Sequence, residues 1–248
     1  MSVFDGRGSI LCLVTHGGRI AARTSAMGTS VEDLLVKQVS EAASAGVDLV
    51  QIREPNLETG RLCRLIERCV EVAAGLPARI VVNDRADAAL AAGAHGVHLR
   101  ADSYAGDRVR AIAPSGFIVG RSVHDADEAA DVTSSGALDY IIFGTVFESA
   151  SKPPGHTTTG IDGLAAAAAA ARPVPVLAIG GVSTHRAAAI KSAGAAGVAG
   201  IALFLPGEAG GEPTLAATVH RLRAAFDTPQ TSAENERRSR TPPCPTDP

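Results

Sequence analysis

The stretch RIVVNDRADAALAAGAHGVHL, residues 79–99, contains two short runs of branched aliphatic residues that each meet polar side chains. The run IVV is followed directly by Asn83 and Asp84, and the second run, GVHL, contains His98. An amide, a carboxylate and an imidazole are poor fillers for a strand buried on both faces. Alanine-rich residues lie between the two runs, so the stretch predicts a strand, a helix and a second strand, with polar groups presented at the strand ends.

The same alternation recurs along the whole chain and predicts the fold class. Strands are expected at 10–14, 47–52, 79–83, 95–99, 116–120, 138–143, 175–180 and 196–201. Helices are expected at 31–45, 58–74, 86–93, 106–113, 125–135, 161–171, 184–193 and 214–226. Eight such units predict an α/β protein with a single (β/α)8 barrel over 10–226, after a lead-in at 1–9. The alternative, an open doubly wound sheet, usually has a GxGxxG after its first strand, and residues 11–19, LCLVTHGGR, do not supply one.

Composition restricts the class of protein and its partners. Hydrophobic residues make up 46% of the 248 residues, which is enough for a large core. A net charge of −3 and a pI near 6.2 do not indicate a nucleic-acid partner or an acidic membrane surface. No apolar run approaches the roughly 20 residues of a membrane span, and the four cysteines lack zinc-site spacing and are expected to be free thiols. We expect a soluble cytoplasmic protein whose Pro/Ser/Thr-rich segment 227–248 is a disordered C-terminal tail.

Polar residues follow most of the predicted strands. In a (β/α)8 barrel, the carboxyl ends of the strands and the loops after them form the active face. The sequence therefore predicts that Asn83, Asp84 and His98 lie at the rim of one pocket. The same face is expected to receive side chains from the ends of other strands: Gln51, Arg53, Ser122 and His124.

Several of these residues also have a structural interpretation. Asp84 could cap the helix that follows it, because aspartate before an apolar periodic run is a common N-terminal signal. Arg53 and Glu54 could form an ordinary surface ion pair. His98, inside GVHL, fits a hydrogen-bonded core histidine better than a catalyst, whereas the position of His124 after a strand end favours a role in the site.

Two glycine-containing turns and one long loop indicate binding of anionic groups. Gly180 and Gly181 end the strand in AIGG, and Ile201 follows the last strand, at the position where barrels often hold phosphate. Glycine at a strand end is also needed for tight turns, so this signal alone is moderate. The loop 144–160 carries further hydrogen-bond donors for a second anion: Ser149, Ser151 and Lys152.

Six segments together resemble the thiamine phosphate synthase/TenI family: QIRE (51–54), VNDRADAALAAGAHGVHL (82–99), GRSVH (120–124), FGTVF (143–147), SASK (149–152) and AIGG (178–181). The resemblance implies a TIM barrel that acts in thiamine biosynthesis on a small thiazole phosphate substrate, and it suggests a homodimer. One activity in the family joins hydroxymethylpyrimidine diphosphate to thiazole phosphate with Mg²⁺. The other, in TenI proteins, aromatises a thiazole phosphate carboxylate tautomer.

The sequence departs from the synthase pattern at three places. Pro55 stands where the run that holds the pyrimidine diphosphate, after Gln51 and Arg53, has a lysine. The resemblance assigns Mg²⁺ to Asp84 and a second aspartate, but Ser103 occupies that second position and only Asp102 is adjacent. Ala202 replaces a serine beside Ile201. These losses disfavour a working synthase, because a diphosphate leaving group needs dense positive charge.

GRSVH and VFESASK resemble TenI proteins more closely, so from the sequence we expect a thiazole tautomerase that needs no cofactor. In this interpretation His124 moves the proton as a general acid and base. The phosphate would be held by Gly180, Gly181 and the Ile201 loop, and the carboxylate by Arg53 and Lys152. A synthase that binds Mg²⁺ through Asp84 is the first alternative, and a barrel that binds thiazole phosphate without turnover is the second.

Overall fold

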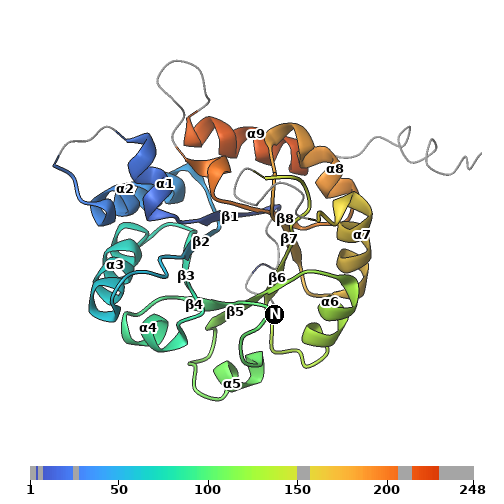
Figure 1. Ribbon diagram of the computed structural model, residues 1–248, viewed down its shortest axis with the longest axis horizontal. Coiled ribbons are helices and arrows are strands. Elements are labelled where there is room, and N and C mark those ends of the chain that lie inside the picture. The colour runs from blue at the N-terminus through green and yellow to red at the C-terminus, as the bar shows by residue number, and fades with distance from the viewer. Residues whose placement is uncertain (1–3, 5–7, 25–27, 150–156, 206–213, 229–248) are drawn as a thin grey trace, which may run out of the picture.

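The computed structural model describes residues 4, 8–24, 28–149, 157–205 and 214–228, which form a closed barrel of parallel strands in the order β1 to β8 (Figure 1). The strands are β1 (Ile10–Val14), β2 (Leu49–Ile52), β3 (Arg79–Asn83), β4 (Gly96–Leu99), β5 (Ile118–Val123), β6 (Tyr140–Phe143), β7 (Val176–Ala178) and β8 (Gly197–Gly200). Because β8 also pairs with β1, the predicted (β/α)8 barrel is confirmed and the open doubly wound sheet is excluded.

Helices surround the strands on the outside of the barrel (Figure 1). The α-helices are α1 (Gly17–Arg23), α2 (Val31–Ala45), α3 (Thr59–Val72), α4 (Ala86–Ala91), α5 (Gly106–Arg110), α6 (Ala126–Thr133), α7 (Gly160–Ala170), α8 (Ala187–Ser192) and α9 (Leu215–Asp227). Two 3₁₀ turns are η1 (Thr184–Arg186) and η2 (Ala202–Phe204). The end of α9 includes Asp227, the first residue of the segment predicted to be a tail, and the rest of that segment beyond Thr228 lies outside the described residues.

Two elements differ from the prediction in ways that affect the site. Strand β5 runs over 118–123 instead of the expected 116–120, because Gly116 turns the chain with a φ of 80°. This shift places Ser122 inside the strand and His124 directly after it. Helix α1 was not predicted; it begins after His16, whose imidazole accepts a hydrogen bond from the backbone N–H of Arg19.

The barrel lumen is filled by small and branched side chains and one tyrosine. The strand residues of this cluster are Ile10, Cys12, Val14, Leu49, Val81, Ile118, Tyr140, Ile142, Leu177 and Ala199, and Phe4 packs edge-on against the Tyr140 ring with centroids 6.0 Å apart. A larger cluster fills the layer between strands and helices. Because side chains alternate along a strand, the next residues on the lumen side of β2 and β3 toward their carboxyl ends are the polar residues Gln51 and Asn83, which begin the mouth of the barrel.

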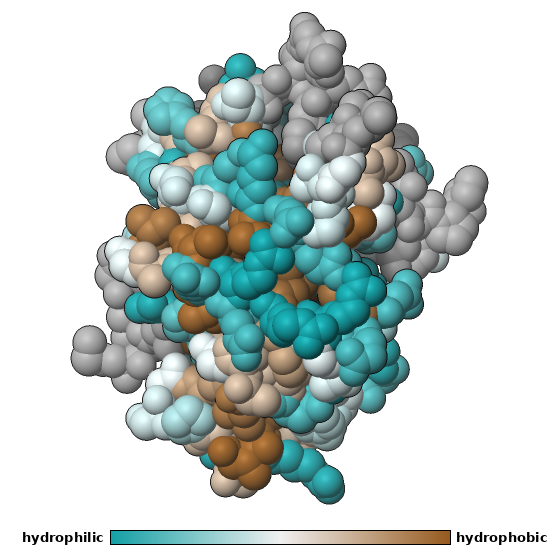
Figure 2. Space-filling view, turned by 90° about the vertical axis from the view of Figure 1, so that its left-hand side faces the viewer, coloured by the Kyte–Doolittle hydropathy of each residue, from teal (hydrophilic) through white to brown (hydrophobic). Residues whose placement is uncertain are grey.

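The outer faces of the helices are hydrophilic over much of the side that Figure 2 shows. Ion pairs link α2 and α3: Arg68 of α3 lies 2.6 Å from Asp33 of α2, and Arg61 of α3 pairs with Glu32 of α2. Within the described part of the chain, no helix has the length and apolar character needed to cross a membrane. Cys12, Cys63 and Cys69 are free thiols, as predicted, and burial raises the pKa of Cys69 to about 12.

Candidate active site

A layer of polar side chains lies above the apolar lumen at the carboxyl ends of β2 to β5. Gln51 on β2 donates a hydrogen bond from Nε2 to Oδ1 of Asn83 on β3, at 2.8 Å. Each lies two residues beyond a lumen residue of its strand, Leu49 and Val81 respectively, so both point to the same end of the lumen. The structure therefore brings together two of the residues predicted to bind substrate.

His98 is part of this layer but does not lie at the pocket rim. Its side chain is 1% exposed, and its two ring nitrogens lie 3.0 Å from the Tyr140 hydroxyl and 2.9 Å from Oγ of Ser122. Burial, with a smaller effect of Arg121, lowers its pKa to about 3. The rim placement was wrong, whereas the alternative of a hydrogen-bonded core histidine is confirmed. A neutral buried imidazole here supports Ser122, which remains partly exposed.

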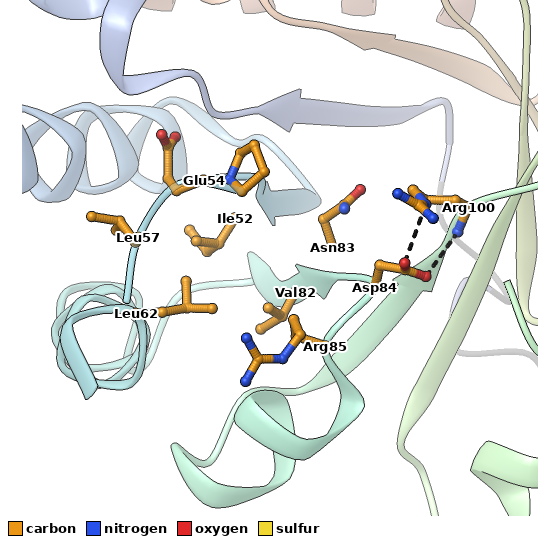
Figure 3. Close-up of a pocket in the computed structure, with 10 residues that line it drawn as sticks. Ile52, Glu54, Leu57, Leu62, Val82, Asn83, Asp84, Arg85 and Arg100 are labelled. Atoms are coloured by element: carbon orange, nitrogen blue, oxygen red, sulfur yellow. Dashed lines mark hydrogen bonds and ion pairs between the residues drawn. The ribbon is translucent and has the colours of Figure 1, made fainter. Parts of the chain in front are cut away.

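Asp84 has an unusual backbone for a non-glycine residue, with a φ of 57°. Its Oδ1 accepts the Ser103 hydroxyl at 2.5 Å, and its Oδ2 lies 3.2 Å from Nε of Arg100 (Figure 3). The expectation that Asp84 caps the next helix was wrong, since the N-cap of α4 is Arg85 and makes no side-chain capping bond. The left-handed turn presents the Asp84 carboxylate to the loop after β4 instead.

A cavity of about 180 Å³ lies beside Asp84 and is drawn in Figure 3. Its lining combines the apolar residues Ile52, Pro55, Leu57, Leu62 and Val82 with the polar residues Glu54, Asn83, Asp84, Arg85 and Arg100. Arg53 is exposed and lies in the chain between the lining residues Ile52 and Glu54. The surface ion pair considered for Arg53 and Glu54 is not formed, because Glu54 accepts hydrogen bonds from the Thr15 hydroxyl at 2.8 Å and the Gly17 amide at 2.9 Å.

The family resemblance implies Mg²⁺ for the synthase reaction, and the contacts of Asp84 test whether the ion fits. Both Asp84 oxygens already contact neighbours, one of them the Arg100 guanidinium, and Ser103 offers a hydroxyl in place of a second carboxylate. Asp102 is exposed and lies 3.1 Å from the same guanidinium. Among the described residues, no three His, Cys, Asp or Glu side chains are grouped to hold a metal ion. The residues present therefore do not fit a two-carboxylate Mg²⁺ site.

His124 follows β5 at the mouth and is exposed. Its Nδ1 lies 2.6 Å from the carbonyl oxygen of Gly144, after β6, and its backbone N–H donates to Glu128 at 2.7 Å. A carbonyl only accepts hydrogen bonds, so Nδ1 must carry the proton in this contact, and in the neutral form of the ring Nε2 has the lone pair. His124 is thus held in the tautomer that a general base requires.

A second cavity, of about 110 Å³, lies at the ends of β7 and β8. It is lined by residues that the sequence predicted for an anion, Ser149, Gly180, Gly181 and Ile201, together with Arg19, Ile179, Val182, Ala199, Gly200, Ala202 and Leu203. Gly181 has a φ of 60°, and a Cβ there would lie 2.2 Å from the Glu148 carbonyl oxygen. The glycine is therefore required by the fold as well as suited to an anion. Ser151 and Lys152 lie outside the described residues.

The sequence did not predict the roles of three residues, two of which line the cavities while the third lies in the lumen. Arg19 reaches the second cavity from α1, an element that the pattern did not reveal. Arg100 was not considered, because a charged residue after a strand is usually solvated and its pairing with Asp84 is a tertiary contact. From the sequence, Tyr140 was expected only to be part of a buried strand. No local signal indicates that its hydroxyl crosses the lumen to His98.

Comparison with known proteins agrees with this architecture. The family model described as thiamine monophosphate synthase matches residues 23–204. The thiamine-phosphate synthase of Chlorobium luteolum is 36% identical over 192 residues, which cover 77% of this chain and 90% of that protein. The thiamine-phosphate synthase of Methanoculleus marisnigri is 36% identical over 184 residues, covering 74% and 85%. The solved thiamine phosphate pyrophosphorylase of Pyrococcus furiosus has a TM-score of 0.69 at 26% identity, covering 88% and 95%.

The closed parallel barrel and the polar residues at its mouth define an α/β-barrel enzyme. Within that class, the chain belongs to the thiamine monophosphate synthase/TenI family. This family assignment does not specify a TenI subtype. The curated relatives are named synthases, and these names support the synthase alternative better than the tautomerase that we favoured from the sequence.

Proposed function

We propose that this protein is a thiamine-phosphate synthase, which joins hydroxymethylpyrimidine diphosphate to thiazole phosphate. The observation that carries the proposal is the 36% identity to a synthase over 90% of that relative's length. The two cavities at the mouth add support, because a two-substrate reaction with two phosphorylated partners needs two separate anion sites.

The cavity beside Asp84 suits the diphosphate end of the pyrimidine substrate. Arg100 and Arg85 line it as members of ion pairs with Asp84 and Asp87, and Arg53 is exposed beside it, so guanidinium groups that can donate hydrogen bonds to a diphosphate are at hand. Gln51 and Asn83 present amides beside this cavity and suit hydrogen bonding to a pyrimidine ring. The proposal assigns these residues to binding and orienting the first substrate.

The cavity at β7 and β8 suits thiazole phosphate. Gly180 and Gly181 leave the backbone open to close approach by an anion, and Arg19 adds a cation to the lining. Ser122 and Ser149 add hydroxyls at the mouth, and Ser151 and Lys152 are proposed as further donors on the sequence alone. With this assignment, the pyrimidine substrate binds beside Asp84 and thiazole phosphate binds at the ends of β7 and β8. The two substrates then face each other over the polar layer at the mouth.

The test of this assignment is a substitution that removes charge without changing size. Asp84→Asn removes the charge that holds Arg100 at the edge of the first cavity, and it should lower the rate of thiamine phosphate formation by about 10²-fold, the scale of one lost electrostatic contact in a reaction centre. Asp33→Asn removes the same charge from an exposed ion pair on α2 and should leave the rate within about twofold. Equal rates for the two variants would exclude a role for Asp84 in the reaction.

A specific observation supports tautomerisation as a second candidate function. The Nδ1 contact of His124 leaves Nε2 as the proton acceptor of the neutral ring, without a hydrogen-bond partner among the described residues, and the residues around Asp84 do not fit a two-carboxylate metal site. His124→Ala should then reduce tautomerase turnover by about 10²–10⁴-fold while thiazole phosphate still binds. Binding of thiazole phosphate with neither reaction would instead indicate a non-catalytic barrel.

A further inference from the structure

Three side chains form a continuous hydrogen-bonded path from the barrel interior to the mouth. His98 on β4 lies between the Tyr140 hydroxyl on β6, 3.0 Å from its Nδ1, and Oγ of Ser122 on β5, 2.9 Å from its Nε2. Tyr140 is 0% and His98 1% exposed, whereas Ser122 is partly exposed. The path therefore connects the buried interior to a partly exposed hydroxyl at the mouth of the barrel.

The space for this path comes from a glycine in β5. A Cβ at Gly120 would lie 2.1 Å from the Tyr140 ring, so any side chain there would displace the tyrosine. Gly120 pairs with both His98 and Tyr140 in the sheet register. Strand β5 thus supplies both the gap that the ring crosses and the serine at the end of the path.

The direction of each hydrogen bond follows from the donors and acceptors available. Burial lowers the pKa of His98, so its neutral ring has one N–H donor and one acceptor nitrogen. Burial also raises the pKa of Tyr140, whose hydroxyl keeps its proton. Within the part of the chain that the structure describes, His98 is the hydrogen-bond partner of that hydroxyl. The tyrosine proton must go to Nδ1, because a buried hydroxyl proton without an acceptor is costly.

With Nδ1 accepting, Nε2 carries the ring proton and donates it to Oγ of Ser122. We propose that Tyr140 and His98 are positioning residues that fix the Ser122 hydroxyl as a hydrogen-bond donor to the bound substrate. Beside Ser122 at the mouth, an acceptor atom of the ligand, such as a ring nitrogen or a phosphate oxygen, is favoured, and an amino group is disfavoured. The ligands used in the binding test below are chosen from the proposed function. The direction of the hydrogen bonds from Tyr140 to Ser122 does not depend on that function.

The first test reads the tautomer directly. In the full-length protein labelled with ¹⁵N-histidine, two-bond ¹H–¹⁵N correlation spectra should show the Nε2–H form of His98, unchanged between pH 8 and pH 5. The Nδ1–H form would overturn the proposal, because Ser122 would then donate to the ring and act as an acceptor toward the ligand. This measurement needs no activity, and the signals of His98 among those of the seven histidines are the ones absent from His98→Gln.

The second test separates positioning from a merely structural role through a double-mutant cycle. Calorimetry measures the binding of hydroxymethylpyrimidine diphosphate and of thiazole phosphate to Ser122→Ala, Tyr140→Phe and the double variant. Ser122→Ala should weaken one of these ligands by about tenfold and Tyr140→Phe by about three- to tenfold. The double variant should bind no more weakly than Ser122→Ala, because both changes act on one hydroxyl.

Additive losses in the double variant would overturn the positioning role even with the expected tautomer. If neither ligand binds the wild-type protein, the proposed function fails while the spectrum still decides the direction of the path. Should Tyr140→Phe fail to fold, the wild-type spectrum alone decides between the two tautomers.

Discussion

At the scale of single residues, Asp84 combines backbone strain with a carboxylate directed at the mouth. A φ of 57° puts this L-residue in the left-handed region, which costs about 1 kcal/mol relative to glycine. Such strain persists where the surrounding structure needs it, and it is concentrated at functional sites. Here the conformation brings the carboxylate to Ser103 and Arg100.

Substituting Asp84 by glycine and by alanine separates the strain from the chemistry. Both variants lose the carboxylate contacts and should lose thiamine phosphate formation. Asp84→Gly should nevertheless be more stable than Asp84→Ala by about 1 kcal/mol, because glycine adopts a positive φ freely. Urea denaturation of both variants measures the difference, and equal unfolding free energies would show that the turn relaxes when the side chain is removed.

The buried His98 should make stability depend on pH in a defined direction. Its pKa is about 3 in the folded protein and near 6.5 in the unfolded chain, so below pH 6.5 the unfolded state takes up a proton that the folded state does not. Stability should therefore be unaffected above pH 6.5 and fall from there toward pH 3, by up to about 1.4 kcal/mol per pH unit.

Denaturation at pH 7.5 and pH 4.5 tests this expectation against His98→Gln. Burial and Arg79 also lower the pKa of His95. Because His95 is present in both the wild type and His98→Gln, it contributes the same loss of stability to both at low pH. The wild type should lose more stability between the two pH values than the variant. Parallel losses would mean that His98 is protonated in the folded protein over this range.

At the scale of elements, the turn after β7 is where backbone conformation and ligand space coincide. Gly181→Ala should destabilise the fold by about 3 kcal/mol, because its Cβ would lie 2.2 Å from the Glu148 carbonyl oxygen at a positive φ. The same turn lines the proposed thiazole phosphate cavity, so the Kd for thiazole phosphate should rise as well.

Gly194→Ala is the matched control for this turn. Gly194 also has a positive φ, of 90°, but its Cβ would meet nothing closer than the Ala168 Cβ at 3.5 Å, and it does not line either cavity. The Gly194→Ala variant should lose about 1 kcal/mol of unfolding free energy and keep its affinity for thiazole phosphate. Unchanged affinity in Gly181→Ala would remove the turn from the proposed site.

The elements also show which features a sequence can predict. Helix α2 was predicted at its observed bounds because both ends carry local signals: the Ser30 side chain caps the helix, and Gly46 ends it in the left-handed conformation. Strand β5 was misplaced because GFIVG has the composition of a strand, whereas pairing with β4 and β6 carries the real strand through Arg121 to Val123. Pairing between strands is not encoded in either segment alone.

The same distinction, between features with a local signal and features that depend on tertiary contacts, applies to the site. Gln51, Asn83 and Asp84 could be predicted because polar residues at the ends of buried strands have few structural explanations. The contacts of Asp84 with Arg100 and Ser103 could not, since they depend on how the loop after β4 folds back over β3. Likewise, the exposed rim expected for His98 was wrong because Tyr140 meets it across the lumen.

At the scale of the whole molecule, a group of charges ties the two ends of the barrel sequence together. Arg223 of α9 lies 2.6 Å from Oδ2 of Asp48, before β2, donates to the Gly46 carbonyl at 2.8 Å and also contacts Ser9. Asp48 in turn accepts the backbone N–H of Leu11 in β1 at 2.8 Å. The last helix is thereby joined to the first two strands.

Arg223→Met should lower the unfolding free energy by about 2 kcal/mol or more, because it leaves the buried Asp48 carboxylate without this partner. Lys37→Met breaks an exposed pair with Glu41 and should change stability by less than about 0.5 kcal/mol. Neither residue lines a cavity at the mouth, so thiamine phosphate formation below the unfolding temperature should be unchanged in both. A loss of activity in folded Arg223→Met would contradict this expectation. It would show that the contact between α9 and the first two strands affects the reaction at the mouth.

The proposed activity is tested most directly by thiamine phosphate formation. The purified full-length protein is given hydroxymethylpyrimidine diphosphate, thiazole phosphate and Mg²⁺, and the product is followed by chromatography. We predict multiple turnovers in the wild type and their loss in Asp84→Ala. A folded protein that forms no thiamine phosphate, yet converts the thiazole phosphate carboxylate tautomer in a reaction that needs His124, would contradict the synthase proposal and establish the second candidate.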